Sequence, residues 1–86
     1  MRKTLLDCPE QDCVASPAEQ QLLPPQQYAE IPAEDRYRIE SRTLNGIIDV
    51  SIMLCTRCKS VYGRWPTRNH IFGRFENQKW SASKNL

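Results

Sequence analysis

Four cysteines in a chain of 86 residues constrain the fold more than any other feature of the sequence. They form two pairs, Cys8 with Cys13 and Cys55 with Cys58, and residues 14–54 separate the pairs. A domain of this size buries only about 60–65% of the surface of its unfolded chain, so apolar burial alone stabilises it marginally. Small domains usually gain further stability from disulfides, a metal ion or a partner. We therefore expect the cysteines to supply a cross-link or a metal site.

The choice between disulfides and metal depends on the compartment. The first residues offer only Leu5 and Leu6 before Asp7, whereas a secretory signal needs an apolar run of roughly 7–15 residues. No apolar run approaches the ~20 residues of a membrane-spanning helix. We expect a cytoplasmic protein with no membrane partner. Disulfides rarely persist in the cytoplasm, so paired cysteines favour metal binding there.

The second cysteine pair, Cys55-Thr-Arg-Cys58, lies where two predicted strands meet. A tight turn at that junction directs both sulfurs to the same side and turns backbone amides toward them. Four thiolates complete a tetrahedron around Zn2+ and leave no open coordination position, which marks a structural site. We predict one structural zinc ion as the cofactor, with Cys8, Cys13, Cys55 and Cys58 as its ligands.

Three alternatives to this zinc site stay open. The cysteines could be free thiols in the core, or a disulfide or a redox-active pair at Cys55 and Cys58 could form. His70, the single histidine, could also replace one thiolate. A redox-active C-x-x-C normally opens a helix in a βαβ unit, whereas this one is expected to join two strands.

Residues 36–55 carry the clearest strand pattern. Asn45-Gly46 is a preferred two-residue hairpin turn between residues 36–44 and 47–55. Antiparallel pairing across this turn would place Tyr37 opposite Leu54 and Ile39 opposite Ile52, which gives one apolar and one polar face. The sequence therefore predicts a hairpin that leads into Cys55.

Residues 60–65 are expected to return antiparallel beside this hairpin and to end before Pro66, which cannot donate to a ladder. The fold class is then a small metal-stabilised β-rich domain with a three-stranded antiparallel meander over residues 36–65. A single domain is expected over residues 1–80, with residues 81–86 as a flexible tail. Residues 67–80 give no clear pattern, because Gly73 weakens a helical spacing of apolar residues.

Residues 16–35 are expected to form an N-terminal insertion. Ser16-Pro17-Ala18-Glu19 is a capping-box pattern with proline at the first helical position, which predicts a short helix over residues 17–22. The helix must end there, because Leu23 precedes a proline. Residues 24–35 have the composition of a proline-rich linker.

The pattern Cys8-Pro9, Cys13, Cys55 and Cys58, together with the hairpin before the second pair, resembles the zinc-ribbon superfamily. The resemblance covers roughly half of the chain and implies a zinc-ribbon fold. Zinc ribbons occur in transcription and translation proteins, in nucleic-acid enzymes and in small adaptors, so the resemblance implies no single function.

The chain departs from the zinc-ribbon pattern after the second cysteine of each pair. Glycine often stands there, because the left-handed backbone conformation costs it little. Here the two positions hold Val14 and Lys59. A lysine fits the left-handed conformation at modest cost, whereas a β-branched valine fits it poorly. The turn that holds Cys8 and Cys13, the first knuckle, is therefore expected to differ from the turn that holds Cys55 and Cys58, the second knuckle.

The charges are unevenly distributed along the chain. Residues 1–35 contain two basic and seven acidic side chains, and residues 36–86 contain ten basic and three acidic ones. Aromatic side chains lie among the basic ones. Such a mixture suits phosphates and unpaired bases, and it also suits a protein interface. The predicted binding residues are Arg36, Arg38, Arg42, Arg57, Lys59, Tyr62, Arg64, Trp65 and Arg68.

We expect a non-catalytic zinc-ribbon binding protein that associates with nucleic acid or with the transcription or translation machinery. The alternative is a small adaptor or inhibitor that docks on a larger protein, which the acidic first part favours. Enzymatic activity and a small-molecule substrate are not expected. The sequence has one histidine and no glycine-rich phosphate loop, and a four-thiolate zinc has no open position for a substrate.

Overall fold

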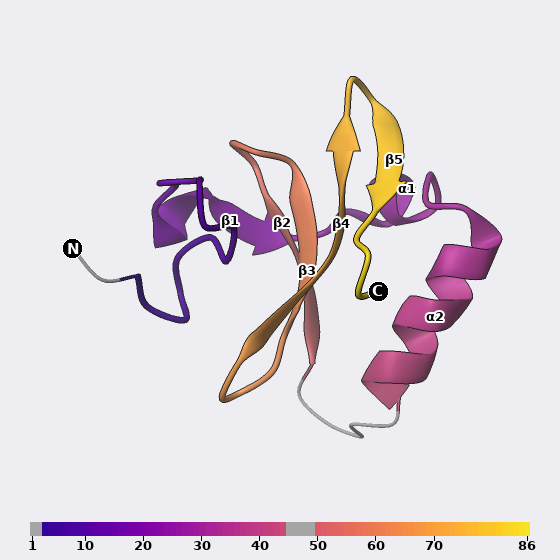
Figure 1. Ribbon diagram of the computed structural model, residues 1–86, viewed down its shortest axis with the longest axis horizontal. Helices are drawn as coiled ribbons and strands as arrows, with labels where there is room; N and C mark the ends of the chain where they lie inside the picture. Colours follow the sequence, from indigo (N-terminus) through magenta and orange to yellow (C-terminus); the bar gives the residue numbers. More distant parts are fainter. Residues whose placement is uncertain (1–2, 45–49) are drawn as a thin grey trace.

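The described part of the chain, residues 3–44 and 50–86 of a computed structural model, forms one five-stranded antiparallel sheet and two α-helices (Figure 1). The strands stand in the sheet in the order β1 to β5. Within the described residues no helix has the length and apolar character needed to cross a bilayer. The elements are the 3₁₀ helix η1 (Pro17–Glu19), β1 (Gln20–Leu22), α1 (Pro25–Tyr28), α2 (Ala33–Leu44), β2 (Ser51–Cys55), β3 (Ser60–Arg64), β4 (Asn69–Glu76) and β5 (Lys79–Ala82).

The predicted return of residues 60–65 beside the strand that ends at Cys55 is confirmed. β2 pairs antiparallel with β3, with Leu54 opposite Val61 and Ser51 opposite Arg64. β3 ends at Arg64, two residues before Pro66. The second cysteine pair therefore lies at a turn between two strands, as its position in the sequence predicts.

The predicted hairpin over residues 36–55 is wrong, because residues 33–44 form α2. This segment contains neither glycine nor proline, and most of its residues are good helix formers. Glu34 and Asp35 stand in the first turn and Arg42 in the last, where their charges favour the helix dipole. Ile39 is 0% exposed and packs on the sheet. The helix thus buries the side chain of Ile39 while its backbone amides and carbonyls form hydrogen bonds within the helix.

The strand pairs expected across the hairpin are replaced by others. Ile52 lies opposite Gly63, and Leu54 lies between Gln21 of β1 and Val61 of β3. Tyr37 is 72% exposed on α2. The predicted turn at residues 45–46 and the start of the second strand, residues 47–49, lie outside the described residues. A five-stranded sheet therefore takes the place of the predicted three-stranded meander.

The predicted helix over residues 17–22 is also wrong beyond its first turn. The capping box is present, and Ser16 N donates to Glu19 Oε2 over 2.7 Å. It opens only the three residues of η1, and the next three form the edge strand β1. Thr56 N donates to Glu19 O and Leu23 N donates to Ile52 O, both over 2.9 Å. The backbone groups of this segment therefore form hydrogen bonds with β2 and with the turn after it, in place of the hydrogen bonds of a longer helix.

Residues 24–35, predicted as a linker, contain α1 and the start of α2. Pro25 opens α1, and Pro32 O accepts bonds from the amides of Asp35 and Arg36 in the first turn of α2. A proline lacks an amide hydrogen, so it costs little where a helix begins. The proline-rich composition therefore marks two helix starts here.

Residues 67–86, which give no clear pattern in the sequence, supply β4 and β5. A Cβ on Gly73 would stand 2.5 Å from Ser81 O and 2.6 Å from the Trp80 ring, so the pairing of these strands needs a glycine there. β5 includes residues 81 and 82, which the sequence assigns to a flexible tail. Ser83 N then donates to Phe72 O over 2.8 Å.

Two separate clusters of buried side chains hold the fold together. α2 lies on one side of the sheet and the N-terminal segment on the other in Figure 1. Trp80 Nε1 donates to Asp35 Oδ2 over 2.9 Å and ties β5 to α2. The smaller cluster attaches the N-terminal segment through Cys8, Cys13, Ala15 and Cys55. The larger cluster between helix and sheet consists of Ile31, Ile39, Leu54, Val61, Phe72 and Phe75.

Candidate metal centre

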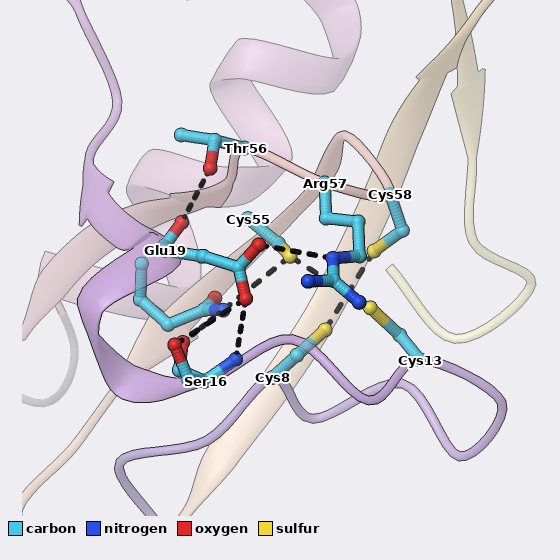
Figure 2. A network of polar contacts seen from close by, with 9 residues as sticks. Cys8, Cys13, Ser16, Glu19, Cys55, Thr56, Arg57 and Cys58 are labelled. Carbon is cyan, nitrogen blue, oxygen red and sulfur yellow. Dashed lines mark hydrogen bonds and ion pairs between the residues drawn. The ribbon is translucent and has the colours of Figure 1, made fainter.

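The four cysteines meet at one point, although residues 14–54 separate the two pairs in the chain. Their Sγ atoms all lie within 4.8 Å of one another. Cys8 and Cys13 come from the loop before η1, Cys55 ends β2, and Cys58 stands in the turn to β3 (Figure 2). Three of them are buried and Cys58 is partly exposed. This cluster is compatible with a metal ion.

The sulfur distances fit a tetrahedral metal site. Cys8 Sγ lies 3.6 Å from Cys58 Sγ, and Cys13 Sγ lies 3.9 Å from Cys55 Sγ. The edge of a tetrahedron with metal–sulfur bonds of about 2.3 Å is about 3.8 Å. A disulfide requires about 2.05 Å, and none of the four cysteines forms a disulfide in this structure. The disulfide alternative is therefore wrong for this structure.

The second knuckle has the turn that its sequence predicts. Lys59 has φ 67°, the left-handed conformation expected after the second cysteine, and its amide donates to Cys55 O over 2.8 Å. Burial tends to raise the pKa of Cys55. The backbone amides of Cys58 and Arg57 and the side-chain amide of Gln20 donate to its sulfur and together lower this pKa to about 7. These donors would also stabilise a metal-bound thiolate.

The first knuckle uses a different turn. Cys13 N donates to Glu10 O over 3.2 Å, and Val14 is not among the described residues with positive φ. The strain expected at this valine is therefore absent, and its side chain is 80% exposed. Burial raises the pKa of Cys8 and of Cys13, although backbone amides donate to both sulfurs. A cation among these sulfurs would offset the cost of ionising them.

A buried polar group links the first knuckle to the sheet. Ser60 is 0% exposed, and its hydroxyl donates to Glu10 Oε2. Arg74 Nη2 lies 3.3 Å from the same oxygen. Glu10 thus joins the loop between Cys8 and Cys13 to β3 and β4. Sequence reasoning missed this role, because nothing in the local pattern relates Glu10 to residues so distant in the chain.

A second ion pair connects η1 to the second knuckle. Glu19 Oε1 accepts a bond from Arg57 Nε over 2.9 Å, and Thr56 Oγ1 donates to Glu19 O over 2.9 Å (Figure 2). The bond from Ser16 N, and then the bond from Arg57, lower the pKa of Glu19. Both ion pairs of the described residues therefore join the acidic first part of the chain to the basic second part.

The predicted binding residues do not share one face of the sheet. Tyr62 is 0% exposed, and its hydroxyl donates to Gln20 Oε1 over 2.8 Å. Arg64 lies over the Tyr62 ring at 5.6 Å from the centroid. Arg57 and Lys59 belong to the second knuckle. The helix α2, and not a strand, carries Arg36, Arg38 and Arg42.

A second pair of predicted binding residues meets next to the end of β3. The guanidinium of Arg68 lies 4.3 Å from the centroid of the Trp65 ring. His70, the alternative metal ligand, lies elsewhere, with Nε2 3.0 Å from Asn85 O. Among the described residues, the group that could hold a metal contains the four cysteines alone.

Comparison with models of known families, with curated proteins and with solved structures found no match to this chain.

Proposed function

We propose that the chain is a non-catalytic zinc ribbon that binds one structural Zn2+ through Cys8, Cys13, Cys55 and Cys58. The observation that carries this proposal is the set of four sulfurs within 4.8 Å, with spacings close to the edge of a zinc–thiolate tetrahedron. Four thiolates fill the coordination sphere, so the ion would connect segments of the chain and leave no position for a substrate.

Metal content measured by native mass spectrometry tests this proposal. We expect one zinc per chain. Replacing Cys8 with serine should abolish stoichiometric binding, because one thiolate is lost. The matched control is His70→Ala, which should keep one zinc, since His70 lies outside the cysteine cluster. Loss of zinc in the control, or no zinc in the unaltered chain, would contradict the four-thiolate site.

The role that the structure supports best for this zinc-stabilised domain is that of a small adaptor or inhibitor which docks on a larger protein. Two arginines that suit a phosphate, Arg57 and Arg74, are paired with carboxylates of the same chain. Tyr62, an aromatic expected to contact a ligand, is wholly buried. Exposed leucines at positions 5 and 6 instead supply apolar surface, which is typical of a protein interface.

Association with nucleic acid is the second candidate function. Arg38, Arg42 and Arg68 are exposed, and exposed arginines can neutralise phosphates. Binding of a single-stranded oligonucleotide, measured at several salt concentrations, separates the two functions. A steep loss of affinity with salt would favour nucleic acid. For docking on a protein, we expect no binding of the oligonucleotide at low salt and a stoichiometric protein partner that nuclease treatment leaves bound.

A further inference from the structure

An open cavity of about 410 Å³ lies between the N-terminal segment and the ends of β2 and β3. This volume is within the range of ~300–1,000 Å³ found for ligand pockets. None of its lining residues is a cysteine or belongs to the metal centre. The lining residues are Leu5, Leu6, Ser51, Arg64, Trp65 and Pro66.

The apolar walls of this cavity are exposed and held in place. Leu5 is 46% exposed and Leu6 is 57% exposed. Asn69 Nδ2 donates to Leu5 O over 3.0 Å and fixes the N-terminal segment against the start of β4. Trp65 packs edge-on against the buried ring of Phe72, with centroids 6.4 Å apart. A partner would therefore meet a surface that needs little reordering, which lowers the entropy cost of binding.

The rim of the cavity is basic. None of the six lining residues is acidic. Arg64 lines the cavity, and Arg68 lies beside it over the Trp65 ring. Among the described residues, the two ion pairs involve Arg57 and Arg74, so neither Arg64 nor Arg68 is paired with a carboxylate. Arg64 Nη2 donates to the Tyr62 hydroxyl over 3.2 Å, which holds this guanidinium at the cavity.

We propose that this cavity, with Arg64 and Arg68 at its rim, is the docking site for an acidic peptide segment of a partner protein. This proposal rests on the docking function proposed above and names its surface. One large apolar side chain of the partner enters between Leu6 and Trp65. Carboxylates next to it pair with the two arginines, which gives the charge complementarity that selects the partner.

A nucleic acid fits this surface less well than a peptide. Arg68 covers one face of the Trp65 ring at 4.3 Å from its centroid, and base stacking needs an open aromatic face. Leucine side chains at positions 5 and 6 offer contacts to an apolar side chain and no partner for a phosphate.

Selection from a library of random short peptides, displayed on phage and panned on the purified chain, tests the proposal. We expect the selected peptides to carry a net negative charge and one large apolar residue. Nuclear magnetic resonance titration with a selected peptide should shift the amide signals of Leu5, Leu6, Arg64, Trp65 and Arg68. Selection of neutral or basic peptides, or shifts confined to other residues, would overturn the proposal.

Matched variants test the same surface by a second measurement. Leu6→Asp and Arg68→Glu should each weaken binding of a selected peptide by about tenfold or more, equivalent to about 1.4 kcal/mol. Both residues are exposed, so the substitutions should leave the fold intact. The controls are Tyr37→Asp and Arg38→Glu, two exposed positions on α2, which should bind as the unaltered chain does. Equal loss in variants and controls would overturn the site.

Failure of this inference can be distinguished from failure of the proposed function. A zinc-loaded chain whose protein partner binds Leu6→Asp and Arg68→Glu undiminished would overturn this surface and leave the docking function supported. A chain that binds an oligothymidine strand through the same five residues and selects no acidic peptide would overturn both the surface and the docking function. A chain that selects acidic peptides but holds no zinc would overturn the metal site alone.

Discussion

Lys59 has a left-handed backbone conformation, which favours glycine over lysine. Its φ of 67° lies in the left-handed region, where a side chain costs about 1–2 kcal/mol relative to the right-handed region. Its amide and its carbonyl both bond within the fold, to Cys55 O over 2.8 Å and from Phe75 N over 3.0 Å. The conformation is thus fixed by the knuckle and by β4, and the side chain has little influence on it.

Replacing Lys59 with glycine should therefore stabilise the zinc-loaded chain. Glycine removes the conformational cost of the left-handed backbone at this position. This gain exceeds the cost of the larger conformational entropy that glycine gives to the unfolded chain, which is about 0.4–1 kcal/mol. We expect a gain of up to about 1 kcal/mol in the free energy of unfolding, measured by denaturant titration. The control is Val14→Gly, where no positive φ is relieved and only the entropy cost remains. A loss of stability at Lys59 equal to that at Val14 would contradict this reading of the knuckle.

Glu10 is the residue through which the first knuckle contacts β3 and β4. Replacing it with alanine leaves the hydroxyl of Ser60 buried without its acceptor, which costs about 1–3 kcal/mol. We expect the double variant Glu10→Ala with Ser60→Ala to lose less stability than the two single variants combined, by at least about 0.5 kcal/mol. Denaturant titration of all four chains measures this coupling. Glu30→Ala, at an exposed position, is the control, and strict additivity would refute the link.

At the scale of elements, the choice between helix and strand for residues 33–44 depends on distant neighbours. The alternation of Tyr37, Ile39 and Ser41 satisfies a strand pattern, and the Asn45-Gly46 dipeptide adds a hairpin signal. The same residues satisfy a helix whose fully buried Ile39 enters the core with Leu54 and Phe72. Short segments often fit both the two-residue period of a strand and the 3.6-residue period of a helix, and packing decides between them.

The pairing of β4 with β5 depends on the absence of a side chain at Gly73. A methyl group there would stand 2.5 Å from the carbonyl oxygen of Ser81, which is backbone and cannot rotate away. We expect Gly73→Ala to destabilise the chain by about 1–3 kcal/mol, measured by thermal unfolding. The atoms nearest to a Cβ on Gly63 belong to the side-chain rings of Trp65 and Phe72. Side chains can adjust more than backbone, so Gly63→Ala should cost less. A larger loss of stability for Gly63→Ala than for Gly73→Ala would contradict this prediction, because the rings would then be more rigid neighbours than the backbone.

At the scale of the whole molecule, the cysteine cluster and the helix–sheet core are separate and lie on different parts of the sheet. The cluster attaches the N-terminal segment, and the ion pairs Glu10–Arg74 and Glu19–Arg57 reinforce the attachment. A structural zinc contributes an apparent ~10–16 kcal/mol, whereas a whole domain is stable by only ~5–15 kcal/mol. The metal would therefore dominate the stability of the fold.

Removal of the metal by a chelator should accordingly unfold the chain. We expect the dispersion of amide signals to collapse throughout the sheet, including β4 and β5, and readdition of zinc should restore it. Circular dichroism provides an independent measure of the same loss. Preserved dispersion in β3, β4 and α2, with changes only in residues 3–15, would contradict this prediction and would assign most of the stability to the helix–sheet core.

The sequence by itself determined the parts of this protein that depend on short-range chemistry. Paired cysteines, the turn from Cys55 to Lys59 and the return of residues 60–65 follow from local spacing and backbone preference, and the structure has all three. Only the tertiary structure decided that residues 33–44 are a helix, that β1 joins the sheet edge and that residues 69–82 complete it. Those outcomes depend on which apolar side chains are buried together, and burial brings together residues that are far apart in the chain.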